Sequence, residues 1–149
     1  MPEASLQADY LLAFDYTRSL GNVLGAFHTG LRDRRILGIR SASGKVLVPP
    51  QEFDPDTFET LEQDFVEVGP SGTVATWAWV TEPKPAHPLD HPFAWALITL
   101  DGADTALLHA VDAGDPSAMS TGMTVAPRWR DETAGSILDI EAFVPAGEG

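Results

Sequence analysis

The sequence predicts a mainly β protein in which one N-terminal helix precedes a small barrel of five or six strands. Apolar residues recur at helical spacing between Arg18 and Asp33. From Asp64 onward, six short runs rich in β-branched and aromatic residues are separated by Asp, Gly and Pro. The connections between these runs leave little room for crossover helices, which favours a closed barrel over a parallel sheet.

The predicted helix carries one apolar stripe, formed by Leu20, Val23, Leu24, Phe27 and Leu31. Such spacing is typical of a helix that buries one face. Gly21 and Gly25 lower its intrinsic stability, so we expect it to depend on docking against another part of the molecule. Gly30 is compatible with a helix end close to that residue.

The six expected strands are bounded by turn residues at each end. They are Phe65–Val68, Thr73–Thr81, Phe93–Leu100, Thr105–Val111, Met123–Trp129 and Ile137–Val144. We expect an N-terminal part, residues 1–63, and a barrel, residues 64–149.

Two of these strands are apolar on both faces. Strict alternation over Thr73–Thr81 places Trp77 and Trp79 opposite the face of Val74 and Val80. A barrel interior uses only one face of each strand. One helix can hardly cover the other face, so we expect a partner protein there, with full cover by this chain as the alternative.

Residues 34–57, RRILGIRSASGKVLVPPQEFDPDT, resemble a zinc ribbon without its metal ligands. Aligning the ribbon pattern on Gly44, the Pro49–Pro50 pair and Pro55 places four other residues at the thiolate positions. These are Arg40, Ser43, Asp54 and Thr57. Structural zinc needs four Cys or His donors, and the chain has no cysteine, so we predict that it binds no metal.

The net charge of −13 is unevenly distributed. Six of the nine basic residues precede position 46, whereas eighteen of the twenty-two acidic residues follow it. An acidic barrel disfavours nucleic-acid binding, which depends on Lys and Arg. The basic cluster of Arg32, Arg34, Arg35 and Arg40 could contact the phosphates of a coenzyme or an acidic partner, or simply be solvated.

The residues contain no recognisable catalytic arrangement. His87 and His91 are four apart, but Pro88 and Pro92 disfavour a helix that would bring them together. No nucleophile elbow surrounds a serine, and no Gly-rich phosphate loop precedes a helix. No run is long enough to span a bilayer and no signal sequence is recognisable, so we expect a soluble cytoplasmic protein.

The order of motifs resembles the zinc-ribbon plus OB-fold family of acyl-CoA-associated proteins. The resemblance covers residues 16–145 and is most specific in GKVLVPP, in residues 93–111 and in FVP at 143–145. Within that family, the thiol-free ribbon and the helix are most similar to the OB-fold domains of actinobacterial steroid enoyl-CoA hydratase α-subunits. The resemblance implies a thiolase-like aldolase partner of the SCP-x type, with two copies of each chain, and a hydratase domain or subunit as a further component.

The implied reaction is a retro-aldol cleavage of a 17-hydroxy steroid 20-carboxyl-CoA to a 17-ketosteroid and propionyl-CoA. This chain would bind no cofactor, and the CoA thioester would be a substrate of the complex. We expect the catalytic residues on the partner and the interface on Tyr16, Leu20, Leu24, Phe27, Trp77 and Trp79. The alternative is a stand-alone barrel that binds acyl-CoA or another small ligand.

Overall fold

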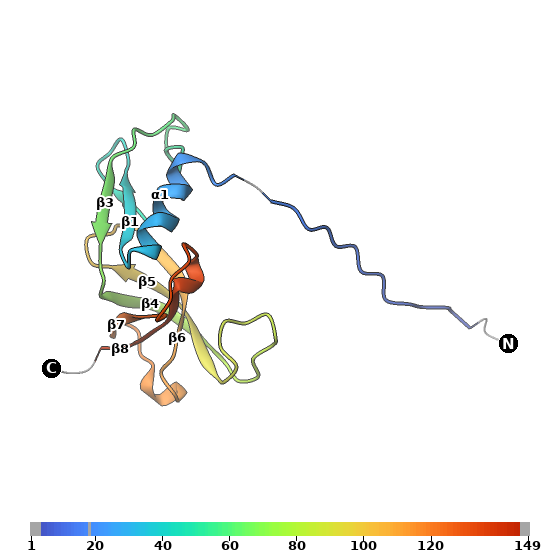
Figure 1. Cartoon of the computed structure of the whole chain (residues 1–149). Helices are drawn as coiled ribbons and strands as arrows, with labels where there is room; N and C mark the ends of the chain where they lie inside the picture. Colours follow the sequence, from blue (N-terminus) through green and yellow to red (C-terminus); the bar gives the residue numbers. More distant parts are fainter. Residues whose placement is uncertain (1–3, 18, 147–149) are drawn as a thin grey trace.

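The computed structural model describes residues 4–17 and 19–146. In this part of the chain, one α-helix precedes two β-sheets, as Figure 1 shows. The predicted mainly β fold is confirmed. The helix is α1 (Gly21–Arg32), and the first sheet contains β1 (Ile36–Arg40), β2 (Val46–Leu47) and β3 (Phe65–Val68). The second contains β4 (Gly72–Val80), β5 (Phe93–Leu100), β6 (Ala106–Val111), β7 (Thr124–Trp129) and β8 (Ile140–Pro145), with 3₁₀ turns η1 (Pro116–Ala118) and η2 (Ile137–Asp139).

The second sheet closes into a five-stranded barrel in the order β4-β5-β6-β8-β7, and β7 pairs back with β4. Strands β4, β5 and β6 form an antiparallel meander. Strand β8 then lies between β6 and β7, parallel to β6 through Val111 and Phe143. This is the Greek-key strand order of an OB-fold.

The first sheet has the order β2-β1-β3 and is antiparallel throughout. Ile36 of β1 pairs with Val68 of β3, and Ile39 pairs with Leu47 of β2. Strand β3 falls within the predicted 64–149 barrel, but here it pairs with β1. The four-residue pattern of β3 identifies a strand without specifying its neighbour, and Gly69, at φ 73°, turns the chain between β3 and β4.

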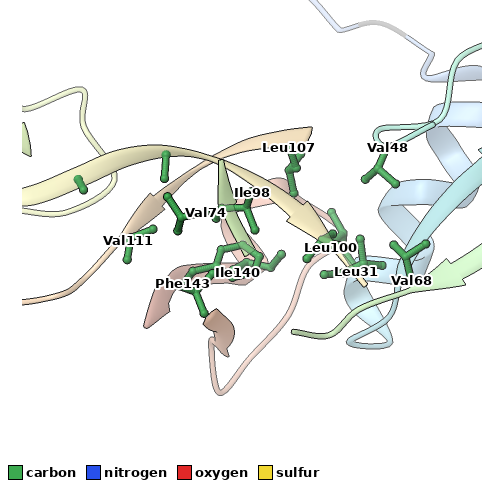
Figure 2. Packing of buried hydrophobic residues seen from close by; sticks show 14 of the residues in the cluster. Leu31, Val48, Val68, Val74, Ile98, Leu100, Leu107, Val111, Ile140 and Phe143 are labelled. Carbon is green, nitrogen blue, oxygen red and sulfur yellow. The ribbon is translucent and has the colours of Figure 1, made fainter. Parts of the chain in front are cut away.

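One hydrophobic core joins the helix, the first sheet and the barrel. Phe27 and Leu31 of α1 are buried, and Gly30 lets the helix approach β1 because a Cβ there would lie 3.1 Å from the Arg35 carbonyl oxygen. Figure 2 shows Leu31, Val48 and Val68 gathered around Leu100 at the end of the barrel interior. Docking thus compensates for the low helical propensity of the α1 glycines.

A β-bulge in β4 changes which side chains face the barrel interior. The register with β5 shifts between Val74 and Thr76. Beyond it, Trp77 pairs with Ala96 and Trp79 pairs with Ala94, and both tryptophans pack against the core. Strict alternation, which predicted an outward tryptophan face, is therefore wrong after residue 74, because the extra residue of a bulge reverses the facing of all later side chains.

Candidate functional site

The first candidate surface lies where α1 meets the loop after β2. Leu20 and Leu24 are 44% and 37% exposed, and Phe53 is 55% exposed. Together with Pro50 they line a hollow of about 360 Å³. We call Leu20, Leu24, Pro50 and Phe53 the helix–loop patch. Three large apolar side chains exposed side by side are typical of a protein interface.

The other predicted interface residues lie in different surroundings. Tyr16 is 82% exposed in the segment that precedes α1. Phe27 is only 3% exposed and belongs to the core, as do the inner faces of Trp77 and Trp79. Their packing indicates that these three side chains stabilise the fold.

The outer face of β5 is partly covered by this chain. His87, in the proline-rich loop between β4 and β5, packs edge-on against Phe93 at 5.6 Å and against Trp95 at 6.2 Å between ring centroids. Leu89 of the same loop is buried with Phe93. The loop thus supplies part of the cover that we expected from a partner.

Of the four positions aligned with zinc ligands, Arg40 ends β1, Ser43 lies in the turn before β2, and Asp54 and Thr57 lie in the loop after β2. Asp54 connects this loop to the turn before β2. Its Oδ2 accepts a hydrogen bond from the Ala42 backbone N–H at 3.0 Å. Its Oδ1 accepts from Asp56 at 2.8 Å and Thr57 at 3.2 Å. These backbone hydrogen bonds, led by that from Asp56, lower the pKa of Asp54 below its ordinary value against the opposing effect of burial.

The donor set at these positions does not suit zinc. Arg40, Asp54 and Thr57 line one hollow of about 430 Å³, whereas the Ser43 hydroxyl contacts that of Ser41 at 3.1 Å. Within residues 4–17 and 19–146, no group of three or more His, Cys, Asp or Glu side chains could hold a metal ion. The Asp54 carboxylate instead joins the two turns directly.

The predicted phosphate-binding arginines are exposed but largely engaged. Arg35 pairs with Glu67 at 3.3 Å and Arg40 with Asp64 at 3.2 Å. Arg34 donates to the carbonyl oxygens of Arg130 and Asp131, which ties the end of α1 to the β7–β8 loop. Arg32 is the one of these four arginines that takes no part in the contacts just described. Coenzyme binding by this cluster stays a prediction.

An apolar cleft of about 500 Å³ lies on the outer face of β5 and β6. Trp95 and Leu108 line it from the strands, His87 and Leu138 from the flanking loops, and Arg130 adds a cation. His109, 5% exposed, also lines it, and burial lowers the pKa of this imidazole. Among the described residues that line the cleft none is a carboxylate, although the chain is strongly acidic. The cleft therefore suits an apolar ligand that carries a negative charge.

A polar network connects the end of the proline-rich loop, at His91, to β7 and β8. Asp112 accepts from Arg128 at 3.0 Å, and its other oxygen lies 3.0 Å from His91 Nε2. Arg128 also donates to Glu141 at 2.7 Å. The hydrogen bond to Asp112, followed by that to Asp90, raises the pKa of His91. An imidazole held between two carboxylates is stabilised in its charged form and is a poor general base.

Residues 65–130 match the family model of the ChsH2 C-terminal OB-fold domain. This barrel segment belongs to the ChsH2-like OB-fold family. The match starts at β3 and ends after β7, so the helix and β8 lie outside it. In the described part of the chain, no helix has the length and apolar character needed to cross a membrane.

Two solved structures share the fold of this chain. A chain of the Ltp2-ChsH2(DUF35) aldolase is 23% identical with a TM-score of 0.59, and the similarity covers 86% of this chain and 98% of that one. A DUF35-family protein of unknown function from Sulfolobus solfataricus is 20% identical with a TM-score of 0.58, covering 72% and 78%. At these identities the likeness establishes the fold. No curated protein matches the chain.

Sequence reasoning missed the cleft of the ChsH2-like barrel. OB-folds commonly bind ligands on the face of their second and third strands, between the first and last loops. Here those strands are β5 and β6, and the loops are residues 81–92 and 130–139. Trp95, Leu108 and Arg130 are apart in the sequence, and only the barrel order brings them together.

Proposed function

We propose that this chain is a non-catalytic, required subunit of a heteromeric aldolase, in which it binds and shapes a thiolase-like partner. The observation that carries the proposal is the fold shared with the Ltp2-ChsH2(DUF35) aldolase chain, 98% of which is covered. The ChsH2 family match over the barrel supports the same assignment. We further propose a steroid CoA thioester with a 17-hydroxyl group as the substrate of the complex.

Retro-aldol cleavage requires a base for the hydroxyl proton and hydrogen-bond donors for the developing thioester enolate. His91 is held by Asp112 and Asp90, and His109 is buried with its Nδ1 3.3 Å from the Ala110 carbonyl oxygen. Lys45 and Lys84 are exposed, and so lack the desolvation that activates a Schiff-base lysine. These surroundings support a catalytic centre on the partner, with this chain acting through the interface.

We assign the docking surface to the helix–loop patch. Leu24 of α1 and Phe53 of the loop after β2 line the same hollow and are exposed, whereas Val23 and Phe27 of α1 are buried. Protein interfaces concentrate binding energy in a few such apolar anchors. A partner covering this patch would remove its apolar surface from water.

Co-expression with the thiolase-like subunit tests the proposal. We expect the two chains to elute together in gel filtration, with two copies of each, and to bind at submicromolar Kd. A matched pair of variants, Phe53→Ser in the patch and Phe58→Ser in the next turn, separates a specific contact from general loss of apolar surface, since Phe58 is 80% exposed and outside the patch. No association of the purified chains would refute the assignment.

The second candidate function is that of a stand-alone ligand-binding barrel, and the cleft favours it. Its apolar lining, with Arg130 and without carboxylates, suits an acyl chain that ends in a charged group. Calorimetry of the isolated chain with an acyl-CoA and with the matching free fatty acid distinguishes the readings. Micromolar binding that Leu108→Glu abolishes would support the ligand-binding role over the subunit role.

A further inference from the structure

Within the described residues, the segment before the helix exposes more large apolar side chains than any other part. Residues 4–17 belong to no helix or strand, and Figure 1 shows them running away from the body of the protein. Six large apolar side chains are between 66% and 99% exposed there: Leu6, Tyr10, Leu11, Leu12, Phe14 and Tyr16. Disordered tails are poor in such residues, so this composition indicates a segment that is covered when the protein functions.

The order of these residues is that of a β-strand. Every even position from 6 to 16 is apolar, namely Leu6, Ala8, Tyr10, Leu12, Phe14 and Tyr16. The odd positions from 7 to 17 are mostly polar: Gln7, Asp9, Leu11, Ala13, Asp15 and Thr17. In a strand the even side chains share one face, whereas in a helix they spread around the whole circumference.

The described part of this chain offers no free edge that is long enough for that strand. The barrel is closed. At β2, the outward N–H groups of Val46 and Val48 already donate to Asp104 and Thr105, both at 2.8 Å. The remaining edge, β3, has only four residues, whereas residues 6–17 would form a strand of roughly 40 Å.

A second copy of the segment is also a poor partner. Its charged groups between residues 4 and 17 are Asp9 and Asp15, without any Lys or Arg. Pairing two copies would bring only carboxylates together, and like charges across a ladder destabilise it. An isolated two-stranded ribbon is at best marginally stable in water.

We propose that residues 6–17 add as an edge strand to an exposed sheet of the thiolase-like partner, with their even side chains buried against it. The partner edge is flanked by an apolar surface and carries Lys or Arg opposite Asp9 and Asp15. Main-chain hydrogen bonds supply affinity in such strand addition, and the alternate side chains supply specificity. This inference rests on the proposed function and names a contact surface outside the helix–loop patch.

The test compares two double variants that remove apolar side chains from opposite faces of the segment. In Leu12→Ser/Phe14→Ser the predicted buried face is changed, and in Leu11→Ser/Ala13→Ser the opposite face is changed. We expect the first to raise the Kd for the purified thiolase-like subunit at least about a hundredfold, since each buried side chain is worth about tenfold or more. The second should change it less than about threefold.

Hydrogen exchange of the complex gives the second readout. An edge strand bonds its partner through alternate residues, so amides between 7 and 17 should be protected in alternation. Both variants should keep the thermal midpoint of the parent protein, because the segment lies apart from the body.

The outcomes separate the two proposals. If the parent chain fails to bind the partner, the proposed function is overturned, and this inference with it. If the parent binds but both variants bind equally and the segment exchanges freely, only the strand addition is overturned. Continuous protection along the segment would indicate a helix, and a segment-dependent dimer of the isolated chain would indicate self-pairing; either result overturns the inference.

Discussion

At the residue scale, the Asp54 carboxylate connects two loops of the N-terminal part through backbone hydrogen bonds. Its two oxygens join the turn at Ala42 to the turn at Asp56 and Thr57. The buried Asp54 carboxylate accepts hydrogen bonds from three backbone N–H groups. Without it, these N–H groups would give up their hydrogen bonds to water on folding and gain no replacement. We therefore expect Asp54 to stabilise the folded arrangement of these two loops.

We predict that Asp54→Asn lowers the thermal midpoint, whereas Asp56→Asn, in the same loop and exposed, leaves it unchanged. The pKa of Asp54 is lowered by folding, so its contribution is present above the ordinary Asp pKa and lost as the pH falls through the folded value. The parent protein should thus lose more stability than Asp54→Asn on acidification, measured by thermal melts across that range. Equal melts for all three proteins, or one zinc per chain in elemental analysis, would contradict this role.

His91 offers a second test at this scale. Its pKa is raised, first by the hydrogen bond to Asp112 and then by that to Asp90. We predict that Asp112→Asn lowers the His91 pKa, measured by NMR titration, more than Asp90→Asn does. Because the folded pKa is raised, the stabilisation is present below the ordinary imidazole pKa and is lost as pH rises through the folded value. A His91 pKa insensitive to Asp112→Asn would contradict the network.

At the scale of elements, the helix divides into a buried and an exposed stripe. The sequence predicted the helix and its apolar residues, but its periodicity could not separate the two roles. Leu31 is fully buried and Phe27 nearly so, whereas Leu20 and Leu24 remain exposed on the adjacent side. The position of the first sheet determines which apolar residues of α1 are buried. The sequence of α1 alone does not specify them.

We predict that Phe27→Ala mainly lowers stability, whereas Leu24→Ser mainly weakens partner binding. Phe27→Ala should lower the free energy of unfolding by about 3 to 5 kcal/mol, since it empties a packed core position. Leu24→Ser should cost less than about 1 kcal/mol and weaken partner binding instead. Denaturant titration gives the free energy of unfolding, and calorimetry gives the affinity for the partner. If Phe27→Ala weakened binding without lowering stability, Phe27 would be an interface residue.

The bulge in β4 is a feature of the strands that could not be predicted from the sequence. The predicted runs lie within three residues of the observed strands, because turn residues bound each one. An unpaired residue near Ala75 has no comparable signature, yet it turns Trp77 and Trp79 toward Ala94 and Ala96. The complementary sizes of these pairs become visible only once the register is known.

We predict that Trp77→Ala lowers the free energy of unfolding by about 3 kcal/mol, because the indole fills space above Ala96. Ala78→Ser, next in the strand and exposed, should change it by less than about 0.5 kcal/mol. Denaturant titration measures both. A stable Trp77→Ala protein with weakened partner binding would support the outward face that strict alternation predicted.

At the scale of the whole molecule, the fold combines a closed barrel with apolar surfaces that remain uncovered. Leu20 and Leu24 of the helix–loop patch follow residues 6–17 closely in the sequence, at the start of α1. The uneven charge was evident from the sequence, whereas the cleft depended on the barrel order. Together these features favour a protein that works by contact with another.

The most direct test of this account is the rate of retro-aldol cleavage of a 17-hydroxy steroid 20-carboxyl-CoA by each purified chain and by their mixture. We predict turnover by the mixture, none by this chain alone and little by the thiolase-like subunit alone, with propionyl-CoA released in step with the 17-ketosteroid. Turnover by this chain alone at a rate comparable to that of the mixture would place the catalytic residues here. A thiolase-like subunit that is equally active without this chain would contradict its required role.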